Sequence, residues 1–141
     1  MWVPNSWTQE ISTLVKSLAP KKLIIDGTYG VNSSHFEVKD IDVFSNHYYP
    51  LNITKMQVDI EMVEKANRVY SVGEYDWTGK GGVNMSDFFA VIEAQQKKRK
   101  PVVVGDLFWR YVSPLTTSIF FLLCVRRIDC FLELGKEADG S

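Results

Sequence analysis

The stretch VYSVGEYDW, residues 69–77, is the part of the sequence from which the fold can be worked out. Its first half is apolar and rich in β-branched and aromatic residues, which favours a short buried strand. An acid, Glu74, comes directly after Gly73, and the aromatic residues Tyr75 and Trp77 lie just beyond it. We therefore expect a strand that ends near Gly73 and presents Glu74 past its end, among aromatic rings.

Three further short apolar runs resemble this one. They cover residues 23–25, 41–44 and 101–104, and each is followed by a cluster of polar or aromatic side chains. The clusters are Asp26 with Gly27, the segment SNHYYP at residues 45–50, and the segment GDLFW at residues 105–109. Short, nearly continuous apolar strands are typical of a parallel sheet that is covered by helices.

Amphipathic segments alternate with these strands. The first begins with a capping box, Ser6 with Gln9, and stops before Pro20. Two more predicted helices begin at the second capping box, Thr54 with Gln57, and at Ser86. Alternating strands and helices predict an α/β fold, in which functional side chains gather at the carboxyl ends of the strands.

The composition narrows the possible partners. A chain of 141 residues fits one domain, and 45% hydrophobic with 23% charged residues is ordinary for a globular protein. The formal charge of -1 provides no basic face for nucleic acid or an anionic membrane. The longest apolar run, residues 119–125, is too short to span a bilayer. Two cysteines, Cys124 and Cys130, form neither a disulfide framework nor a zinc pattern.

Two features bear on where the protein works. The first residues, MWVPN, lack the basic and apolar regions of a signal peptide. Three Asn-x-Ser/Thr sequences, at Asn32, Asn52 and Asn84, nevertheless match the acceptor pattern for N-glycosylation. Chance alone produces some matches to so short a pattern, so the location stays open at this point.

The residues around Glu74 suit carbohydrate chemistry. Sugar rings stack on aromatic faces, and four aromatic residues, Tyr49, Tyr75, Trp77 and Trp109, follow predicted strands. A glutamate among them can attack or stabilise an oxocarbenium-like anomeric carbon. We therefore consider a glycan site at this end of the sheet.

Most of these residues also have a purely structural interpretation. Glu74 can be a solvated loop acid, and His47 can be a core histidine bound to a backbone carbonyl. Tyr48 and Tyr49 can be core rings with solvated hydroxyls. The acids that follow the first and fourth strands can equally cap loops or helices. No phosphate-binding glycine pattern, metal-spaced histidine pair or Gly-x-Ser-x-Gly elbow occurs in the sequence.

Four segments, in this order, resemble the second half of a family 5-like glycoside hydrolase, and most of all the fungal endo-β-1,4-mannanase type. The segments are KLIIDGTYGVN (22–32), DIDVFSNHYYPLN (40–52), ANRVYSVGEYDWTG (66–79) and KPVVVGDLFW (100–109). SNHYYP followed by VGEYDW is the specific part, and the resemblance covers residues 6–109. It implies a parallel (β/α) barrel fragment of about four β/α units, strands five to eight of a TIM barrel.

The resemblance also implies a role for each matched residue. Glu74 would end strand seven as the catalytic nucleophile. His47 and Tyr49 match the family's His-x-Tyr after strand six, which positions the nucleophile and lines the sugar subsite. Trp109 matches the aromatic platform after strand eight, and we add Trp77, beside Glu74, as a sugar-binding candidate. No metal or other cofactor is implied.

The sequence departs from the family pattern in two places. The family's general acid/base glutamate follows an asparagine at the end of strand four, and no Asn-Glu pair occurs in this chain. Asp26 and Asp106 are candidates to replace this acid/base glutamate only because we expect them to lie near Glu74 in the barrel. From Ser113 onward the sequence also stops resembling the family, so we divide the chain into a partial hydrolase domain (1–113) and a divergent tail (114–141). The tail is either an altered terminus or a family variant whose last helix contains residues 119–134.

These observations lead to one expected function and two alternatives. We expect a hydrolase of β-linked polysaccharide such as mannan, extracellular in the parent family, with no nucleic-acid or membrane partner. The first alternative is a non-catalytic carbohydrate-binding remnant, and the second is a small flavodoxin-like protein with an open sheet. Four strands of a barrel would also leave two open sheet edges, through which the chain could associate with itself.

Overall fold

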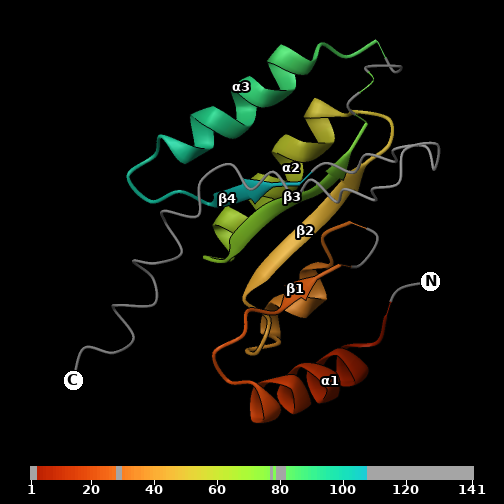
Figure 1. The fold of residues 1–141 in the computed structure, drawn as a ribbon, viewed down its shortest axis with the longest axis vertical. Helices are drawn as coiled ribbons and strands as arrows, with labels where there is room; N and C mark the ends of the chain where they lie inside the picture. The colour runs from red at the N-terminus through yellow and green to blue at the C-terminus, as the bar shows by residue number, and fades with distance from the viewer. Residues whose placement is uncertain (1–2, 28–29, 77, 79–81, 108–141) are drawn as a thin grey trace, which may run out of the picture.

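The computed structural model of the protein describes residues 3–27, 30–76, 78 and 82–107. These residues form one sheet with helices around it (Figure 1). In chain order the elements are α1 (Asn5–Leu18), β1 (Ile25–Asp26), the 3-10 helix η1 (Ser33–Glu37), β2 (Val43–Tyr48), α2 (Ile53–Lys65), β3 (Val69–Tyr75), α3 (Met85–Gln96) and β4 (Val103–Asp106). The divergent tail (114–141) lies outside the described residues.

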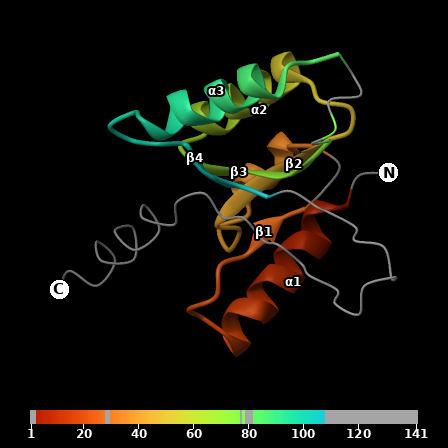
Figure 2. The same cartoon turned by 45° about the horizontal axis from the view of Figure 1, so that its top comes forward.

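All four strands are parallel, and their order in the sheet is the order in the chain, β1-β2-β3-β4. Helices α2 and α3 lie side by side on one face of the sheet, whereas α1 lies near the β1 edge (Figures 1 and 2). The predicted α/β class with a parallel sheet is therefore confirmed. A flavodoxin-like sheet has the order 2-1-3-4-5, which the described strands do not follow.

The strands end later than the apolar runs that predicted them. Strand β2 continues to Tyr48 and β3 to Tyr75, so Glu74 lies inside its strand and not past its end. The reason is that pairing between β2 and β3 continues through His47 with Glu74 and through Tyr48 with Tyr75. The polar side chains at these positions do not end the strands, because the backbones of β2 and β3 still pair there.

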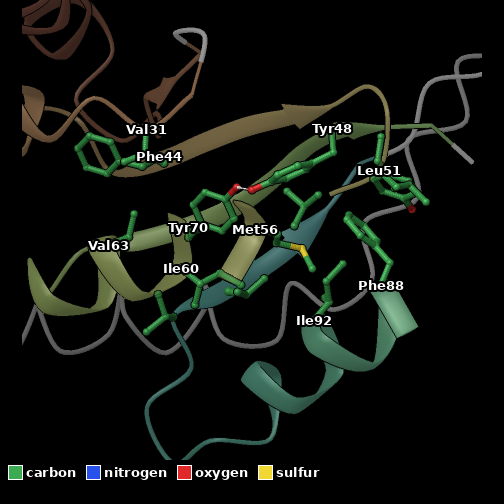
Figure 3. Close-up of a cluster of buried hydrophobic side chains, with 14 of the residues drawn as sticks. Val31, Phe44, Tyr48, Leu51, Met56, Ile60, Val63, Tyr70, Phe88 and Ile92 are labelled. Carbon is green, nitrogen blue, oxygen red and sulfur yellow. Dashed lines mark hydrogen bonds between the residues drawn. The ribbon is translucent and has the colours of Figure 1, made fainter. Parts of the chain in front are cut away.

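The main hydrophobic core lies between the sheet and helices α2 and α3 (Figure 3). Phe44 and Tyr70 project from neighbouring strands into it, and Met56 of α2 and Phe88 of α3 meet them from the helices. All four side chains are fully buried. Burial of this apolar surface supplies most of the stabilisation of the layer.

A polar network is buried inside this core. The Tyr48 hydroxyl donates to the Asp59 carboxylate (2.8 Å) and lies 2.5 Å from the Tyr70 hydroxyl. The Asn46 amide donates to the same carboxylate oxygen (2.6 Å). Burial, more than any neighbouring charge, raises the pKa of both tyrosines far above its ordinary value. Tyr48 is thus a core ring as one interpretation allowed, but its hydroxyl is bonded to protein and not to solvent.

Asparagines begin three of the four helices. The side chains of Asn32, Asn52 and Asn84 accept hydrogen bonds from backbone amides at the starts of η1, α2 and α3. The predicted caps, Thr54 and Ser86, instead lie inside the first turn. The same three asparagines form the Asn-x-Ser/Thr sequences, so helix capping accounts structurally for all three. At α1 the predicted capping box is wrong, because Pro4 occupies the N-cap and no side chain caps the helix.

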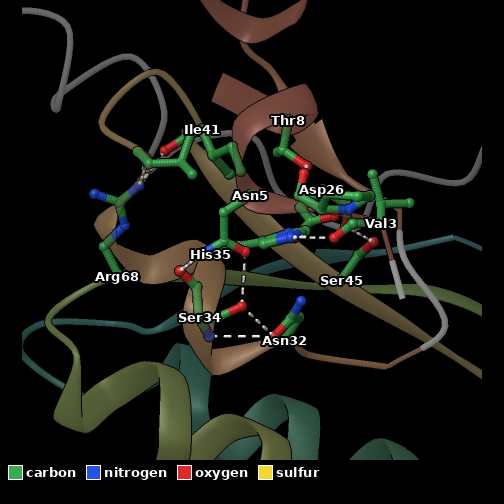
Figure 4. Close-up of polar contacts among 12 residues, drawn as sticks. Val3, Asn5, Thr8, Asp26, Asn32, Ser34, His35, Ile41, Ser45 and Arg68 are labelled. Atoms are coloured by element: carbon green, nitrogen blue, oxygen red, sulfur yellow. Dashed lines mark hydrogen bonds and ion pairs between the residues drawn. The ribbon is translucent and has the colours of Figure 1, made fainter. Parts of the chain in front are cut away.

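A buried ion pair holds the start of the chain against β1 (Figure 4). Nδ1 of His35 lies 2.9 Å from a carboxylate oxygen of Asp26, and Nε2 lies 3.1 Å from the backbone oxygen of Val3. Both ionisable side chains are almost fully buried. Because both ring nitrogens face acceptors, this histidine connects η1, β1 and the residues before α1.

We expect His35→Ala to lower the free energy of unfolding by about 3 kcal/mol, since breaking a buried ion pair leaves its other member poorly compensated. Chemical denaturation of the full chain measures this value. The matched control is Lys65→Ala, which removes an exposed ion pair with Glu61 and should cost about 0.5 kcal/mol or less. Equal costs for the two variants would contradict the role given to His35.

Candidate functional site

Glu74 and His47 face each other on neighbouring strands. They are register partners on β3 and β2, and the carboxylate Oε2 lies 3.8 Å from the imidazole Nδ1. This separation is within ion-pair range but longer than a hydrogen bond. Their side chains are 38% and 47% exposed, so both are open to a ligand. The predicted meeting of these two residues near the carboxyl ends of parallel strands is therefore observed.

An irregularity in the sheet sets the direction in which Glu74 points. Asn46 pairs with Val72, but the next residue of β2, His47, pairs with Glu74, so Gly73 is an extra residue in β3. Side chains alternate between the two faces of a strand, and one extra residue reverses this alternation. Val72 contributes to the helix-side core. In a regular strand Glu74, two residues after Val72, would point to that same side.

Gly73 also makes room for the imidazole of His47. A Cβ atom added at Gly73 would lie 2.7 Å from Cδ2 of His47, 2.9 Å from its Nε2 and 3.2 Å from the Asn46 backbone oxygen. A side chain at this position therefore cannot coexist with the observed ring. The glycine therefore allows another group to come close to the strand, and that group is the histidine.

The backbone at the irregularity is supported from the helix side. Oδ1 of Asn46 accepts a hydrogen bond from the backbone amide of His47 (2.8 Å), while its amide group donates to Asp59 of α2. Asn46 and Asp59 are both buried. No local sequence pattern predicts this support, because the two residues meet only through the packing of α2 on β2.

Tyr49 adds a phenol to the group. Its side chain is largely exposed, and it follows the end of β2. Partial burial raises the pKa of Tyr49 above its ordinary value, and the charge of Glu74 and a hydrogen bond to it raise the pKa further. The charge of Asp76 contributes in the same direction. The structure thus brings together three of the predicted site residues, His47, Tyr49 and Glu74.

Only part of the group of aromatic residues that we predicted around Glu74 is observed there. Tyr75 belongs to the other face: it is buried against Phe88 and donates its hydroxyl to Asp106 (2.9 Å). It is therefore not a sugar-stacking residue, and that prediction is wrong. The other two predicted residues, Trp77 and Trp109, lie outside the described part of the chain.

Neither of the aspartates that end β1 and β4 joins Glu74. Asp26 pairs in register with Phe44 and bonds to His35, and Asp106 pairs with Val72 and bonds to Tyr75. Register partners share a face of the sheet. Both acids therefore point to the helix side, where both are buried. They cannot supply the second carboxyl group of a glycosidase site that contains Glu74.

The described residues hold no group of three or more His, Cys, Asp or Glu side chains that could bind a metal ion. No helix among them is long and apolar enough to cross a membrane. The chemistry that the arrangement offers is that of one exposed carboxylate with an imidazole and a phenol beside it. A carboxylate of this kind can act as a nucleophile or hold a polar ligand.

We expect Gly73→Ala to expel the His47 ring from its place opposite Glu74. The ring is partly exposed and can move, so the fold should survive with a change in unfolding free energy of about 1 kcal/mol or less. The imidazole resonances in an NMR spectrum should shift markedly. Gly27→Ala is the control, because a Cβ there meets no atom within 4 Å. Unchanged His47 resonances in Gly73→Ala would contradict the close approach.

We also expect the Tyr49 phenol to titrate above 10.0, its ordinary pKa. A raised pKa means that the protonated phenol stabilises the fold at lower pH and that this contribution is lost as the pH rises through the raised value. In Glu74→Gln the pKa of Tyr49 should fall but stay raised, because burial is the largest cause. The phenolate absorbance, taken as the difference from Tyr49→Phe, measures it. An identical pKa in both backgrounds would rule out the contact with Glu74.

Comparison with known proteins adds no relative. No family model matches the chain, and no curated protein matches its sequence.

Proposed function

We propose that the chain is a partial (β/α)8 glycoside hydrolase domain that binds β-linked polysaccharide such as mannan. One observation carries the proposal. Glu74 and His47 are register partners near the carboxyl ends of parallel strands, and Tyr49 lies close enough to Glu74 for this carboxylate to raise the pKa of its phenol. In α/β folds this end of the sheet is where ligands bind.

The arrangement of the sheet supports the barrel part of the proposal. Consecutive strands of a (β/α)8 barrel are neighbours, are all parallel, and carry their helices on the outer face. The order β1-β2-β3-β4 and the packing of α2 and α3 on one face agree with this pattern. On this view the face that carries His47 and Glu74 is the inside of the barrel.

In this proposal each residue has one task. The Glu74 carboxylate attacks the anomeric carbon and forms a glycosyl ester while the leaving oxygen departs. His47 and Tyr49 hold this carboxylate in place and line the sugar subsite, and Trp77 and Trp109 stack on neighbouring sugar rings. A retaining mechanism also needs a second carboxyl group about 5–5.5 Å away to protonate the leaving oxygen.

The second candidate function is carbohydrate binding without turnover. It is favoured by the orientation of Asp26 and Asp106, which both point away from Glu74. A site in which Glu74 has no partner carboxyl group to protonate the leaving oxygen would still hold a sugar. The two functions differ in whether Glu74 can react.

We expect the full chain to bind mannohexaose, and Tyr49→Ala to weaken this binding about tenfold, equivalent to about 1.4 kcal/mol. The loss follows from removing the ring that lines the subsite. Isothermal titration calorimetry measures both affinities. Val58→Ala is the matched control, because Val58 is about as exposed as Tyr49 but lies on α2. Equal affinities for the two variants would remove Tyr49 from the site.

A substrate that needs no proton donor separates the two candidate functions. We expect the full chain to release no reducing sugar from mannan but to release dinitrophenolate from a dinitrophenyl β-mannoside. In that step the carbon–oxygen bond to the phenol breaks as the bond to Glu74 forms, and the phenolate leaves with the electron pair without being protonated. The release should be an initial burst, and Glu74→Gln should abolish it. Sugar binding without any burst would favour the non-catalytic function. Rapid cleavage of mannan would show that the chain does supply a group that protonates the leaving oxygen.

A further inference from the structure

Exposed apolar side chains gather at one place in the described part of the chain. The α1 helix and the segment that enters β1 carry most of them, whereas α2 contributes only Val58. The exposed residues of this region are Trp7, Ile11, Leu14, Val15, Leu18, Leu23 and Ile25. Single exposed apolar residues are ordinary, but a contiguous group on one helix and the strand beside it marks a surface that something covers.

This surface contains a groove of about 510 Å³ between α1 and β1. Trp7, Ile11 and Val15 line it from the helix, and Leu23 and Ile25 line it from the strand. The groove runs along the edge of the sheet, because β1 pairs with β2 on one side only among the described strands. It therefore offers an apolar wall beside an edge strand.

We propose that the groove is covered by the chain's own tail, through the apolar run IFFLLCV at residues 119–125. No charged residue occurs from Ser113 to Val125, and the run holds five large aliphatic or aromatic side chains before Cys124. A segment of this composition is stabilised by any apolar surface that removes it from water. The groove between α1 and β1 is an apolar surface of that kind on the described part of the chain.

The tail is long enough to reach the groove. It leaves the described structure after Leu107, directly past the carboxyl end of β4, and the groove includes Asp26 and Gly27 at the carboxyl end of β1. The two strands are three strand spacings apart, about 14 Å. The twelve residues from Leu107 to Ile119 span up to about 40 Å when extended. The connection therefore crosses this end of the sheet without strain.

The attachment also favours the tail over a second copy of the chain. A segment that belongs to the same chain as its site, joined to it by a short connection, has an effective concentration in the millimolar range. A second copy must compete from solution at a much lower concentration. The tail therefore occupies the groove in the monomer and protects the β1 edge from pairing with other chains.

Crosslinking in the full chain tests the proposal. Leu23→Cys places a thiol on the strand side of the groove, and Cys130→Ser leaves Cys124 as the one native thiol. We expect a short bis-maleimide to join Cys124 to position 23 within one chain. Val58→Cys in the same background is the matched control, because Val58 and Leu23 are 51% and 54% exposed. The yield of joined monomer, measured by peptide mass spectrometry, should be at least tenfold higher for Leu23→Cys.

Each other outcome overturns the proposal. Crosslinks between two chains would show a second copy in the groove, and equal yields for the two variants would show an unspecific tail. No crosslink at position 23, with both thiols reactive toward a single maleimide, would leave the groove to another ligand.

A further variant with Phe120→Asp and Leu123→Asp should abolish the crosslink, since two carboxylates cannot enter an apolar groove.

Discussion

The extra glycine in β3 is the feature on which the candidate site depends. On either side of Gly73 the strands β2 and β3 pair as in any parallel sheet, but the added residue exchanges the two faces for everything that follows it. Glu74 then lies opposite His47 on the face away from α2 and α3, and Tyr75 lies opposite Tyr48 in the core. A glycine is needed here because the His47 ring occupies the space that a Cβ atom would fill.

The two faces of the sheet have different chemistry as a result. On the helix side the polar side chains are buried and bonded to protein. Tyr48, Tyr70, Asn46 and Asp59 form one hydrogen-bonded network inside an apolar core. Such a network is costly unless every member is paired, and it fixes the position of α2 on the sheet. Asn46 also accepts a hydrogen bond from the backbone amide of His47. The buried network on the helix side therefore helps to position His47, whose side chain lies on the opposite face.

The sequence predicted the fold class and the meeting of Glu74, His47 and Tyr49, because both follow from apolar runs whose polar ends lie at one edge of a parallel sheet. It did not predict the direction of Tyr75. A shift of one residue leaves the apolar pattern unchanged and yet moves a side chain to the other face. The pairing of Asp26 with His35 was missed because it joins separate elements, and no local pattern encodes it.

On the proposed function, the β1 edge links the candidate site to the groove. In the family that the sequence resembles, the acid/base glutamate ends a strand that comes just before the helix equivalent to α1, and that strand would pair beside β1. The groove between α1 and β1 lies along the same edge. On the proposed function, an acid-bearing strand and the apolar tail would therefore compete for one surface. A tail in the groove would keep the chain monomeric and, by the same contact, would keep an acid-bearing strand from pairing beside β1.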